Sequence, residues 1–511
     1  MNKSIRAIIP LAVLCYIWFM PVPEGLTKPA MHFVGIFLAV ILALILEPLP
    51  NAAVGLIGCT LAGAMQLVPL AEKSIAAIAT AAKDGTAVVL PTFSASNLTP
   101  AFNWTVSGFV DSTVWLIFIA YMFALGYEKT GLGKRIALIL IAKLGNKALG
   151  LGYASALSDG ILAPFIPSNT ARAAGTVYPV IKNIPVMYNS LPDNEPRKIG
   201  AYLMWTCFAT TCVTSSLFLT GLAPNLAVFS VINSSLKGMG MAEAGTVEWL
   251  NWFWCLAPAG ILLFILVPWL TYVIYPPTQK EFPEAPKWAA GELDKLGPTT
   301  TKEWLMLCMA LLALIGWIFG ASYLNATMVG LVVVCLMVLF NIVTWDDVTA
   351  NKGAWNTFVW FATLVGLAGG LARVGFLTWV GNYFKGYLEG VSPAMLIFGL
   401  LALFYFIHYF FASLTAHTNA VVPMFVAIAV AVPGLKLNMP LFAMILAGSL
   451  GIMGVLTPYA TGPAPIYYNT GYINKATFWF FGTLYGVIFF AVYAVAAMYW
   501  FPVILGPIVM P

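Results

Sequence analysis

The sequence predicts an all-α polytopic membrane protein with about eleven transmembrane helices and two re-entrant hairpins, arranged as an inverted repeat. Three observations predict this fold: the composition, the length of the apolar segments, and landmarks that recur in the second half of the chain. Of the 511 residues, 61% are hydrophobic and 8% are charged, and the mean hydropathy is +0.90. Soluble proteins carry roughly 25% charged residues, so the composition excludes a soluble enzyme.

The apolar segments are long enough to cross a membrane. A helix of roughly 20 residues spans the hydrocarbon core, and apolar runs of about that length recur along the whole chain. Such runs exclude an outer-membrane barrel, whose strands are about 10 residues long and alternate in polarity. Eleven spans are expected, at residues 5–21, 30–47, 51–69, 109–127, 199–231, 249–275, 303–321, 326–344, 355–375, 440–469 and 477–500.

Two further apolar stretches, 136–181 and 380–432, carry a polar cluster in the middle. A lipid-facing helix could not tolerate that cluster, whereas the tip of a re-entrant hairpin can, if protein or water surrounds it. We therefore predict a hairpin in each stretch. The elements then form five regions: N-terminal helices at 1–108, a first repeat at 109–248, helices and a linker at 249–353, a second repeat at 354–475, and a C-terminal helix at 476–511.

The basic residues predict the orientation, because cytoplasmic loops are enriched in Lys and Arg. With the N-terminus in the cytoplasm and the C-terminus outside, the inner segments hold 16 of the 24 basic residues, the outer segments hold seven, and Arg172 lies inside the first hairpin. The inner residues are Lys3, Arg6, Lys129, Lys134, Arg135, Lys143, Lys147, Lys182, Arg197, Lys198, Lys280, Lys287, Lys295, Lys302, Lys352 and Lys475. This bias supports eleven crossings, and we expect a multi-pass protein of the inner (cytoplasmic) membrane.

Composition also limits cofactors and partners. The net charge is only +5 and no basic run occurs, so nucleic acid is not an expected partner. The seven cysteines are odd in number, lie in or beside apolar segments and form no CxxC motif. Such cysteines are typical of small core side chains, and not of disulfides or a metal site. We expect no metal and no cofactor, and membrane lipid as the surrounding partner.

The two halves of the chain share landmarks in one order. Val114-Trp115 matches Val359-Trp360, PSNT from Pro167 matches TAHT from Thr415, and TGLAPN from Thr220 matches TGPAPI from Thr461. The three offsets all lie between 241 and 248 residues. Because the charge bias gives the two copies opposite directions, this is an inverted repeat, which is typical of secondary transporters.

The first hairpin has the motif PFIPSNTAR at its tip. Pro164 and Pro167 cannot continue a helix, and Ser168 or Asn169 is a suitable N-cap for the helix that resumes. The exposed N–H groups and the positive end of the helix dipole would bind an anion, with Thr170 adding a hydroxyl. The alternative is that Ser-Asn-Thr only caps a kink.

The other candidate residues lie in the second hairpin and in two interrupted spans. The second tip contains Ala416, His417 and Thr418, which supply an imidazole and a hydroxyl but follow no proline. The interrupted spans contain Gly221 in TGLAPN and Thr461-Gly462 in TGPAPI. Simple proline kinks are the alternative for both spans, but their matching positions favour a binding site.

These motifs together carry a family resemblance over nearly the whole chain. PSNTARAAGT at 167–176, LTAHTNAVVP at 414–423, TGLAPN and TGPAPI resemble the divalent anion:sodium symporter superfamily. Within it, the chain is similar to the bacterial citrate/succinate, tartrate/succinate and 2-oxoglutarate/malate antiporters. The resemblance implies a homodimer, scaffold helices in 1–108 and 249–353, and a transport domain that moves like an elevator. It also implies that a di- or tricarboxylate binds between the two hairpin tips.

One departure from the family pattern concerns sodium. The sodium-coupled members carry Ser-Asn-Thr in both hairpins, whereas this chain has His417 in place of the second asparagine and Pro164 in place of a sodium-ligating serine. By this resemblance, Arg172 and His417 would replace the sodium ions electrostatically. An empty carrier would then not return without a counter-substrate, which predicts cation-independent antiport.

Both charged residues have an alternative role. Arg172 could instead form a structural ion pair with Asp159 on the other arm of the hairpin. His417 could be a neutral imidazole that only donates a hydrogen bond to the substrate. His32 and His408 lack motif context and are interpreted as interfacial or packing residues.

Other functions fit the sequence less well. A sodium- or proton-coupled symporter of the same acids is the main alternative, and a requirement for a cation gradient would distinguish it. An intramembrane hydrolase would need a nucleophile with an activating base, but no carboxylate accompanies His417 near Ser413 and Thr415. A channel is disfavoured because the polar tips form one central site. The expectation is an exchanger of acids such as 2-oxoglutarate, malate, succinate and citrate, and not an enzyme.

Overall fold

The computed structural model describes residues 3–320, 323–432 and 436–510, and within these ranges the chain is helical and forms no β-strand. Residues 1, 2 and 511, in the first and last predicted regions, and residue 321, the last of the predicted span 303–321, lie outside these ranges. The predicted all-helical fold class is confirmed. The N-terminal helices are α1 (Lys3–Phe19), α2 (Lys28–Leu46), α3 (Asn51–Ala64), α4 (Leu67–Asp84), η1 (Ala95–Asn97), α5 (Leu98–Thr105) and η2 (Ser107–Val110).

The first predicted repeat begins with α6, which Asp111 caps by accepting the Thr113 and Val114 N–H groups. Its elements are α6 (Ser112–Thr130), α7 (Leu132–Leu144), α8 (Ala148–Leu162), the π-helical η3 (Thr170–Val177), α9 (Tyr178–Ile181), α10 (Asn183–Met187), α11 (Gly200–Leu217), η4 (Leu219–Gly221) and α12 (Ala223–Gly238). The helices that follow are α13 (Trp249–Ile274), α14 (Glu284–Leu296), α15 (Thr301–Phe319), α16 (Ala326–Leu339) and α17 (Trp345–Ala350).

The second predicted repeat follows the same outline, with an opening helix, a short helix, two hairpin arms and a broken helix, although its elements differ in number and type. They are α18 (Lys352–Arg373), α19 (Phe376–Lys385), η5 (Gly386–Leu388), α20 (Pro393–Ile407), η6 (His408–Phe410), α21 (Leu414–Val430), α22 (Met439–Met453) and α23 (Pro463–Tyr468), followed by α24 (Lys475–Val495), η7 (Ala496–Trp500) and α25 (Phe501–Leu505). Gly131 before α7 and Gly375 before α19 have φ of 76° and 83°. Both joints therefore need the left-handed conformation that glycine adopts without strain.

Each predicted hairpin range contains, in whole or in part, three continuous helical segments where two half-helices were expected: α7, α8 and η3 with α9 in the first, and α19 with η5, α20 with η6, and α21 in the second. The range 136–181 begins inside α7, which ends at Leu144, and the turn lies between α8 and η3. The range 380–432 begins inside α19, and its turn lies between η6 and α21. The apolar pattern did not separate α7 and α19 from the hairpin arms, because only a short polar connection follows each of them.

Among the described residues, six helices are individually long and apolar enough to cross a membrane: α2, α13, α15, α18, the continuous helical segment from α20 through η6, and the one from α24 to α25. The predicted span 51–69 is bent, since α3 and α4 meet at 46° and would together make a seventh. Other predicted spans are made of shorter pieces, such as α11 with α12. The count of eleven crossings therefore stays a prediction.

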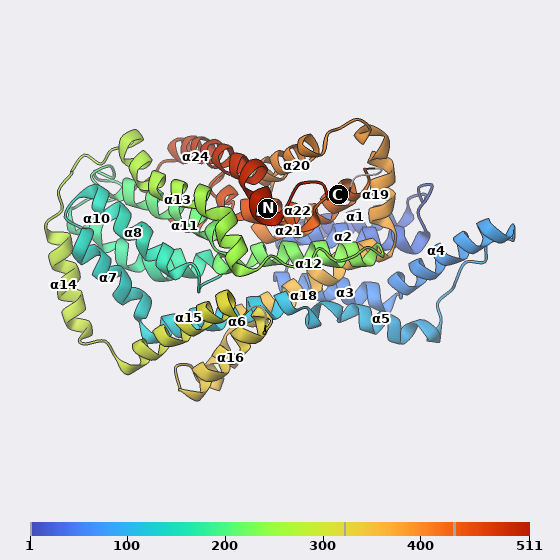
Figure 1. Ribbon diagram of the computed structural model, residues 1–511, viewed down its shortest axis with the longest axis horizontal. Helices are drawn as coiled ribbons and strands as arrows, with labels where there is room; N and C mark the ends of the chain where they lie inside the picture. Colours follow the sequence, from blue (N-terminus) through green and yellow to red (C-terminus); the bar gives the residue numbers. More distant parts are fainter. Residues whose placement is uncertain (1–2, 321–322, 433–435, 511) are drawn as a thin grey trace.

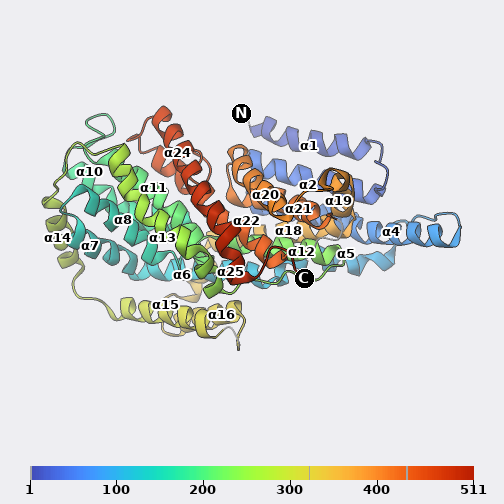
Figure 2. The ribbon, with the colours of Figure 1, turned by 45° about the horizontal axis from the view of Figure 1, so that its top comes forward.

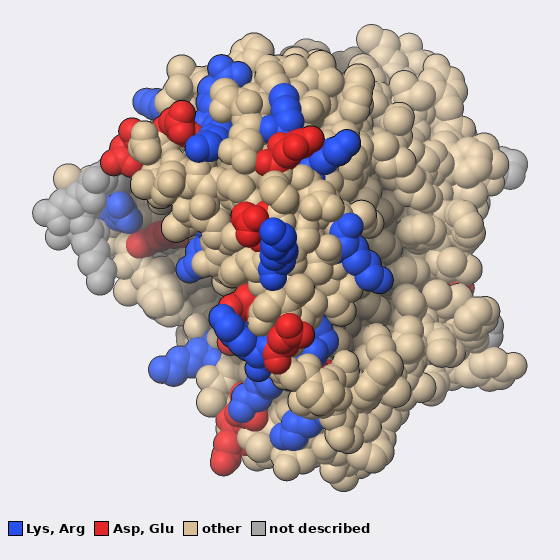
Figure 3. All heavy atoms as spheres, turned by 90° about the vertical axis from the view of Figure 1, so that its left-hand side faces the viewer, with Lys and Arg blue, Asp and Glu red and all other residues tan. Residues whose placement is uncertain are grey.

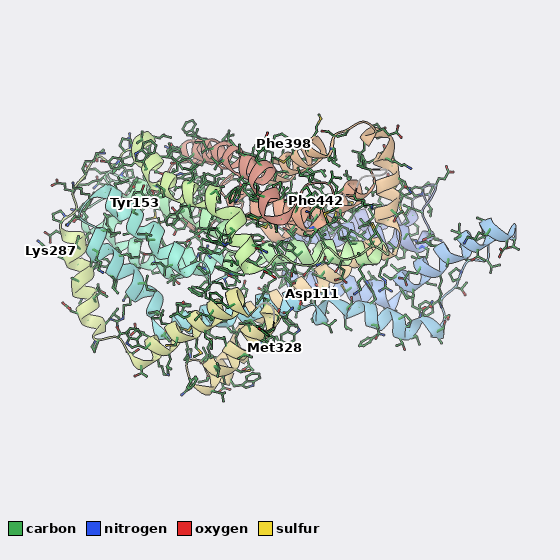
Figure 4. All side chains as sticks on the ribbon, in the orientation of Figure 1. Asp111, Tyr153, Lys287, Met328, Phe398 and Phe442 are labelled. Carbon is green, nitrogen blue, oxygen red and sulfur yellow. The ribbon has the colours of Figure 1, made fainter. Side chains whose placement is uncertain are left out.

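The molecule is an elongated bundle (Figures 1 and 2), and charged side chains gather on the end that faces the viewer in Figure 3. At that end lie α7, α10 and α14, and Lys287 projects outward from α14 (Figure 4). Backbone hydrogen bonds join the connections there: the Ala148 N–H donates to the Lys280 carbonyl at 2.9 Å, and the Thr278 N–H to the Arg197 carbonyl at 3.0 Å. Segments that the sequence assigns to one side of the membrane thus lie together.

The two predicted repeats cross over in the centre of the bundle. The entering arm of each hairpin packs on the broken helix of its own repeat, α8 on α11 and α20 on α22. The returning arm packs on the broken helix of the other repeat, η3 on α23 and α21 on α12. In this arrangement the first hairpin turn contacts both helix breaks, and the second hairpin contacts the break of its own repeat.

Candidate functional site

The two hairpin tips resume as helices in the same way. The Ser168 side-chain oxygen accepts the Ala171 N–H at 3.2 Å, and the Ser413 oxygen accepts the Ala416 N–H at 3.3 Å. Each serine satisfies one of the N–H groups that the first turn of a helix leaves without a partner. The second tip therefore turns at a serine cap although no proline precedes it.

The first tip is held against the first helix break. The Thr220 hydroxyl donates to the Pro164 carbonyl at 2.5 Å, and the Ala223 N–H donates to the Pro167 carbonyl at 2.9 Å. Both proline carbonyls are acceptors that the interrupted helix leaves free, and the break supplies their donors. The Gly-Pro interruption in TGLAPN is thus more than a kink, because it completes the tip.

The first tip also contacts the second helix break. The Asn169 amide donates to the Thr461 hydroxyl at 2.8 Å. A Cβ added at Gly462 would lie 1.9 Å from the Thr170 hydroxyl oxygen, so only glycine admits that side chain. Asn169 and Thr461 are buried, whereas Thr170 is partly exposed and Gly462 is exposed.

Arg172 lies fully buried behind the first tip. Its Nε donates to both carboxylate oxygens of Asp159 at 3.1 Å, and its Nη1 donates to the Ile166 and Gly221 carbonyls at 2.7 and 2.8 Å. Its Nη2 donates to three hydroxyls on α11, those of Thr211, Thr214 and Ser215. All donor groups of the guanidinium are used.

Of the two roles considered for Arg172, the structure shows the ion pair with Asp159. Its charge is balanced inside the first repeat, so Arg172 does not add a net positive charge to an empty site. The guanidinium donates to the Ile166 carbonyl of the first tip and to the Gly221 carbonyl of the first helix break, so it holds these two segments together.

The second tip contains a pair of histidines. Nδ1 of His417 lies 3.0 Å from Nδ1 of His408, and Nε2 of His408 lies 2.8 Å from the Ala460 carbonyl oxygen. Both imidazoles are fully buried. Next to them, Thr418 donates to the Leu414 carbonyl at 2.9 Å, and Ala416 packs in an apolar cluster with residues of α2 and α3.

His408 was therefore misjudged from the sequence as an interfacial or packing residue. It lies at the end of the entering arm, nine residues before His417, and the two rings are hydrogen-bonded. The sequence signal that could have indicated this role is the position of His408 in the polar middle of the second hairpin stretch. His32, in contrast, does stack on the Trp18 ring, with 3.7 Å between ring centroids.

Three consecutive residues of the second break connect the two tips. Ala460 accepts from His408 of the second hairpin, while Thr461 accepts from Asn169 and Gly462 contacts Thr170 of the first. The first hairpin, through Asn169 and Thr170, and the second hairpin, through His408, thus both contact one short segment of the second break. Two capped helix ends, hydroxyls and an imidazole are suited to bind the two ends of a small dianion.

No group of three or more His, Cys, Asp and Glu side chains in the described ranges is arranged to hold a metal ion. The polar groups at the centre are amides, hydroxyls, carbonyls and imidazoles, with a single internally balanced ion pair. Their chemistry is that of a binding site for a small polar molecule in a membrane-embedded, multi-helix protein. Fold and site together define the class of membrane transporters.

Comparison with known proteins gives the family. Residues 1–506 match the family described as the sodium:sulfate symporter transmembrane region, and the chain belongs to it. It is 44% identical over 501 residues to the L-tartrate/succinate antiporters of Escherichia coli K12 and Shigella sonnei, covering 98% of each chain. The resemblance stated from the motifs is therefore confirmed.

Solved structures share the fold at low sequence identity. The YdaH transporter of Alcanivorax borkumensis has a TM-score of 0.55 at 15% identity, with 94% of this chain and 100% of that chain covered. MtrF of Neisseria gonorrhoeae, described with a class of antimetabolite efflux pumps, has a TM-score of 0.58 at 14% identity, with 98% and 99% covered. These matches support the transporter fold alone.

Proposed function

We propose that this chain exchanges small dicarboxylates across the cytoplasmic membrane. The relatives to which it is 44% identical are named L-tartrate/succinate antiporters, which supports the exchange. The observation that carries the proposal is the convergence of both hairpin tips on residues 460–462. Succinate, tartrate, malate, 2-oxoglutarate and citrate all present two carboxylates that a two-sided site of this kind would bind. A transporter of this family has no need of a catalytic nucleophile.

In this proposal each hairpin tip binds one carboxylate. Ser168, Asn169 and Thr170, with Gly221, form the first half-site, and Ala416, His417 and Thr418 form the second. Thr461 and Gly462 lie between them. Partial exposure of Thr170 and exposure of Gly462 support an opening at the point where the two half-sites meet.

Transport is proposed to be independent of sodium. A bound sodium ion needs oxygen ligands, and at the first tip the Ile166 and Gly221 carbonyls already accept from the Arg172 guanidinium. The Ala460 carbonyl at the second break accepts from His408. Protein donors occupy carbonyls at both breaks, which favours exchange over sodium symport.

The mechanical proposal is an elevator in a homodimer. The hairpins and broken helices would move as one transport domain, since hydrogen bonds tie them together, while 1–108 and 249–353 would form the scaffold. The N-terminus would be cytoplasmic and the C-terminus outside. Consistent with that orientation, the Met510 N–H donates to the Lys436 carbonyl at 2.8 Å, which joins two segments assigned to the outer side.

Counterflow in proteoliposomes tests the exchange. Vesicles preloaded with succinate should take up labelled L-tartrate or succinate in sodium-free buffer, whereas unloaded vesicles should take up little. Malate, 2-oxoglutarate and citrate in the external buffer rank the substrates by competition. Strong uptake into empty vesicles under an imposed sodium gradient would show symport and reject the proposal.

Threonine variants test the site. Thr170→Ala and Thr418→Ala should each raise the KM for exchange roughly 5- to 150-fold, which corresponds to about 1–3 kcal/mol for a hydrogen bond to a charged group. Thr80→Ala is the matched control, because Thr80 also donates to the carbonyl four residues earlier but lies at the exposed end of α4. Unchanged KM in both site variants would overturn the assignment.

A further inference from the structure

The hydrogen bonds of the histidine pair have a defined direction at one end. The Ala460 carbonyl oxygen can only accept, so Nε2 of His408 must carry a proton. The two Nδ1 atoms, 3.0 Å apart, must share one proton, since two protons would collide and none would leave two lone pairs facing each other. Two protons on the pair are therefore assigned by geometry.

The remaining nitrogen of the pair is Nε2 of His417. With two protons the pair is neutral and this nitrogen is bare. A third proton makes the pair a cation, and whichever ring holds the shared proton, the third one can only reside on His417 Nε2. The pair therefore changes charge at a single atom.

That atom is buried and has no hydrogen-bond partner in the described part of the chain. The His417 ring lies against Phe404 and Phe411, with ring centroids 4.4 and 4.9 Å away. A cation enclosed by aromatic side chains without a counter-ion is costly, whereas a cation paired with an anion is not. Protonation of His417 is therefore favoured when an anion arrives.

Other ionisable side chains near the pair have partners elsewhere or lie on other parts of the neighbouring helices. Tyr405 donates to the Gly486 carbonyl and Tyr459 to the Tyr409 carbonyl, both at 3.0 Å, and Arg373 pairs with Glu72 at 2.7 Å. Those on the packed elements include Lys28 and His32 on α2, Lys237 on α12, Lys352 and Arg373 on α18, Tyr383 and Lys385 on α19, Tyr405 on α20, Tyr409 on η6, Lys475, Tyr485 and Tyr493 on α24, and Tyr459, Tyr467 and Tyr468 around the second break. None of these hydrogen-bonds to either imidazole in the described ranges.

We propose that His408 is a positioning residue that orients His417, and that the pair takes up one proton together with each dicarboxylate, so that His417 Nε2–H donates to a substrate carboxylate. This inference rests on the proposed function and deepens it. Because the exchanged acids each bring a proton in opposite directions, net proton transport is not required. In this proposal His408 hydrogen-bonds to the second helix break and His417 hydrogen-bonds to the substrate. The protonation of the pair therefore depends on whether the second tip holds a substrate.

The test measures the pH dependence of L-tartrate exchange between about pH 6 and about pH 8, the range in which histidines titrate and L-tartrate stays fully ionised. The KM of the unmodified protein should rise with pH towards the limit of about tenfold per pH unit for one linked proton. His417→Gln should make the KM independent of pH. His408→Leu should raise the KM about tenfold or more and lose the pH dependence, since His417 loses its acceptor.

His408→Gln is the conservative variant, because an amide can donate to Ala460 and accept from His417 with the spacing of an imidazole. It should keep the pH dependence, with a KM within about threefold of the unmodified protein. Should His408→Leu fail to fold, calorimetry of L-tartrate binding to the unmodified protein in buffers of different ionisation enthalpy gives the proton uptake directly. Uptake of up to one proton, absent in His417→Gln, is expected.

Each contrary outcome overturns the inference. A KM that does not change with pH, a His417→Gln variant with the unmodified pH profile, a His408→Leu variant with unmodified KM and profile, or zero proton uptake would do so. Failure of the proposed function is a distinct result, since the unmodified protein would then show no exchange of dicarboxylates at any pH.

Discussion

Single residues at the second helix break decide whether the two hairpins can meet. Gly462 gives room to Thr170, and Thr461 accepts from Asn169, so two neighbouring residues bind the first hairpin to a helix nearly 300 positions later. Gly462 is small and exposed, and on an isolated helix it would have no evident role. Its importance comes from the side chain that it faces.

Gly462→Ala should reduce exchange at least about tenfold, because the added Cβ would overlap the Thr170 hydroxyl and displace the first tip. Gly399→Ala is the matched control: Gly399 lies in α20 of the second hairpin, and a Cβ there meets nothing within 4 Å. Initial rates of counterflow, normalised to the amount of reconstituted protein, give the comparison. Equal rates for the two variants would contradict the close contact.

Asp159→Asn should destabilise the protein strongly, since it leaves the Arg172 guanidinium buried without its counter-charge. Removing one partner of a buried ion pair lowers the free energy of unfolding by about 3–5 kcal/mol. Both side chains of this pair are almost fully buried. Thermal unfolding in detergent measures the loss. The double variant Asp159→Asn/Arg172→Met should recover part of the lost stability while remaining inactive, and an unaltered unfolding temperature in Asp159→Asn would argue against the pair.

At the scale of elements, α7, the short helix before the first hairpin, is tied to α15 and to the connection that precedes it. Arg135 on α7 binds Glu303 in a bidentate pair at 2.6 and 3.1 Å and also donates to the Gly297 carbonyl at 2.9 Å. Glu303 in turn forms a capping box with Thr300. One buried pair thus sets both where α15 begins and where α7 lies.

Arg135→Ala should release this connection, because Glu303 would remain buried without a counter-charge. We expect faster proteolytic cleavage between residues 275 and 300 and a lower unfolding temperature. Lys287→Ala is the control, since the Lys287–Glu284 pair is exposed and such pairs contribute about 0–1 kcal/mol. Identical cleavage rates in the two variants would show that the pair does not hold the linker.

At the scale of the whole molecule, charged connections gather at one end of the bundle (Figure 3). Lys134–Glu292 and Lys129–Asp347 are ion pairs between segments there, at 3.8 and 2.5 Å. The hydrogen bond from Lys129 lowers the pKa of the partly exposed Asp347 carboxyl to about 2. This contribution of Asp347 is present above its ordinary pKa of 3.8 and is lost as the pH falls towards 2, so it is complete at neutral pH.

The orientation of the bundle can be tested with cysteines. In a background where the exposed Cys15, Cys308 and Cys335 are replaced by serine, Lys287→Cys should react with an impermeant thiol reagent only from the cytoplasmic side. Ala242→Cys, in the connection between α12 and α13, should react only from outside. The reverse pattern would invert the topology and with it the direction of both hairpins.

Local chemistry made much of this protein predictable from its sequence. Runs of apolar residues identify helices in a membrane, and serine caps, prolines and Gly-Pro interruptions mark where those helices stop. The positions of both tips, both breaks and the repeat follow from such signals, because each signal acts within a few residues. The separation of α7 and α19 from the hairpin arms was missed, since short polar turns interrupt the apolar pattern too weakly.

Only the tertiary structure decided which polar groups meet. The sequence left Arg172 either free or paired with Asp159, and it gave His408 no role, yet burial makes both pairings necessary because an isolated polar group inside the bundle is costly. The partners are separated by between 9 and 292 residues along the chain. Periodic sequence patterns act over a few residues and do not predict contacts at such separations. The contacts of Ala460, Thr461 and Gly462 with both hairpins therefore follow from helix packing alone.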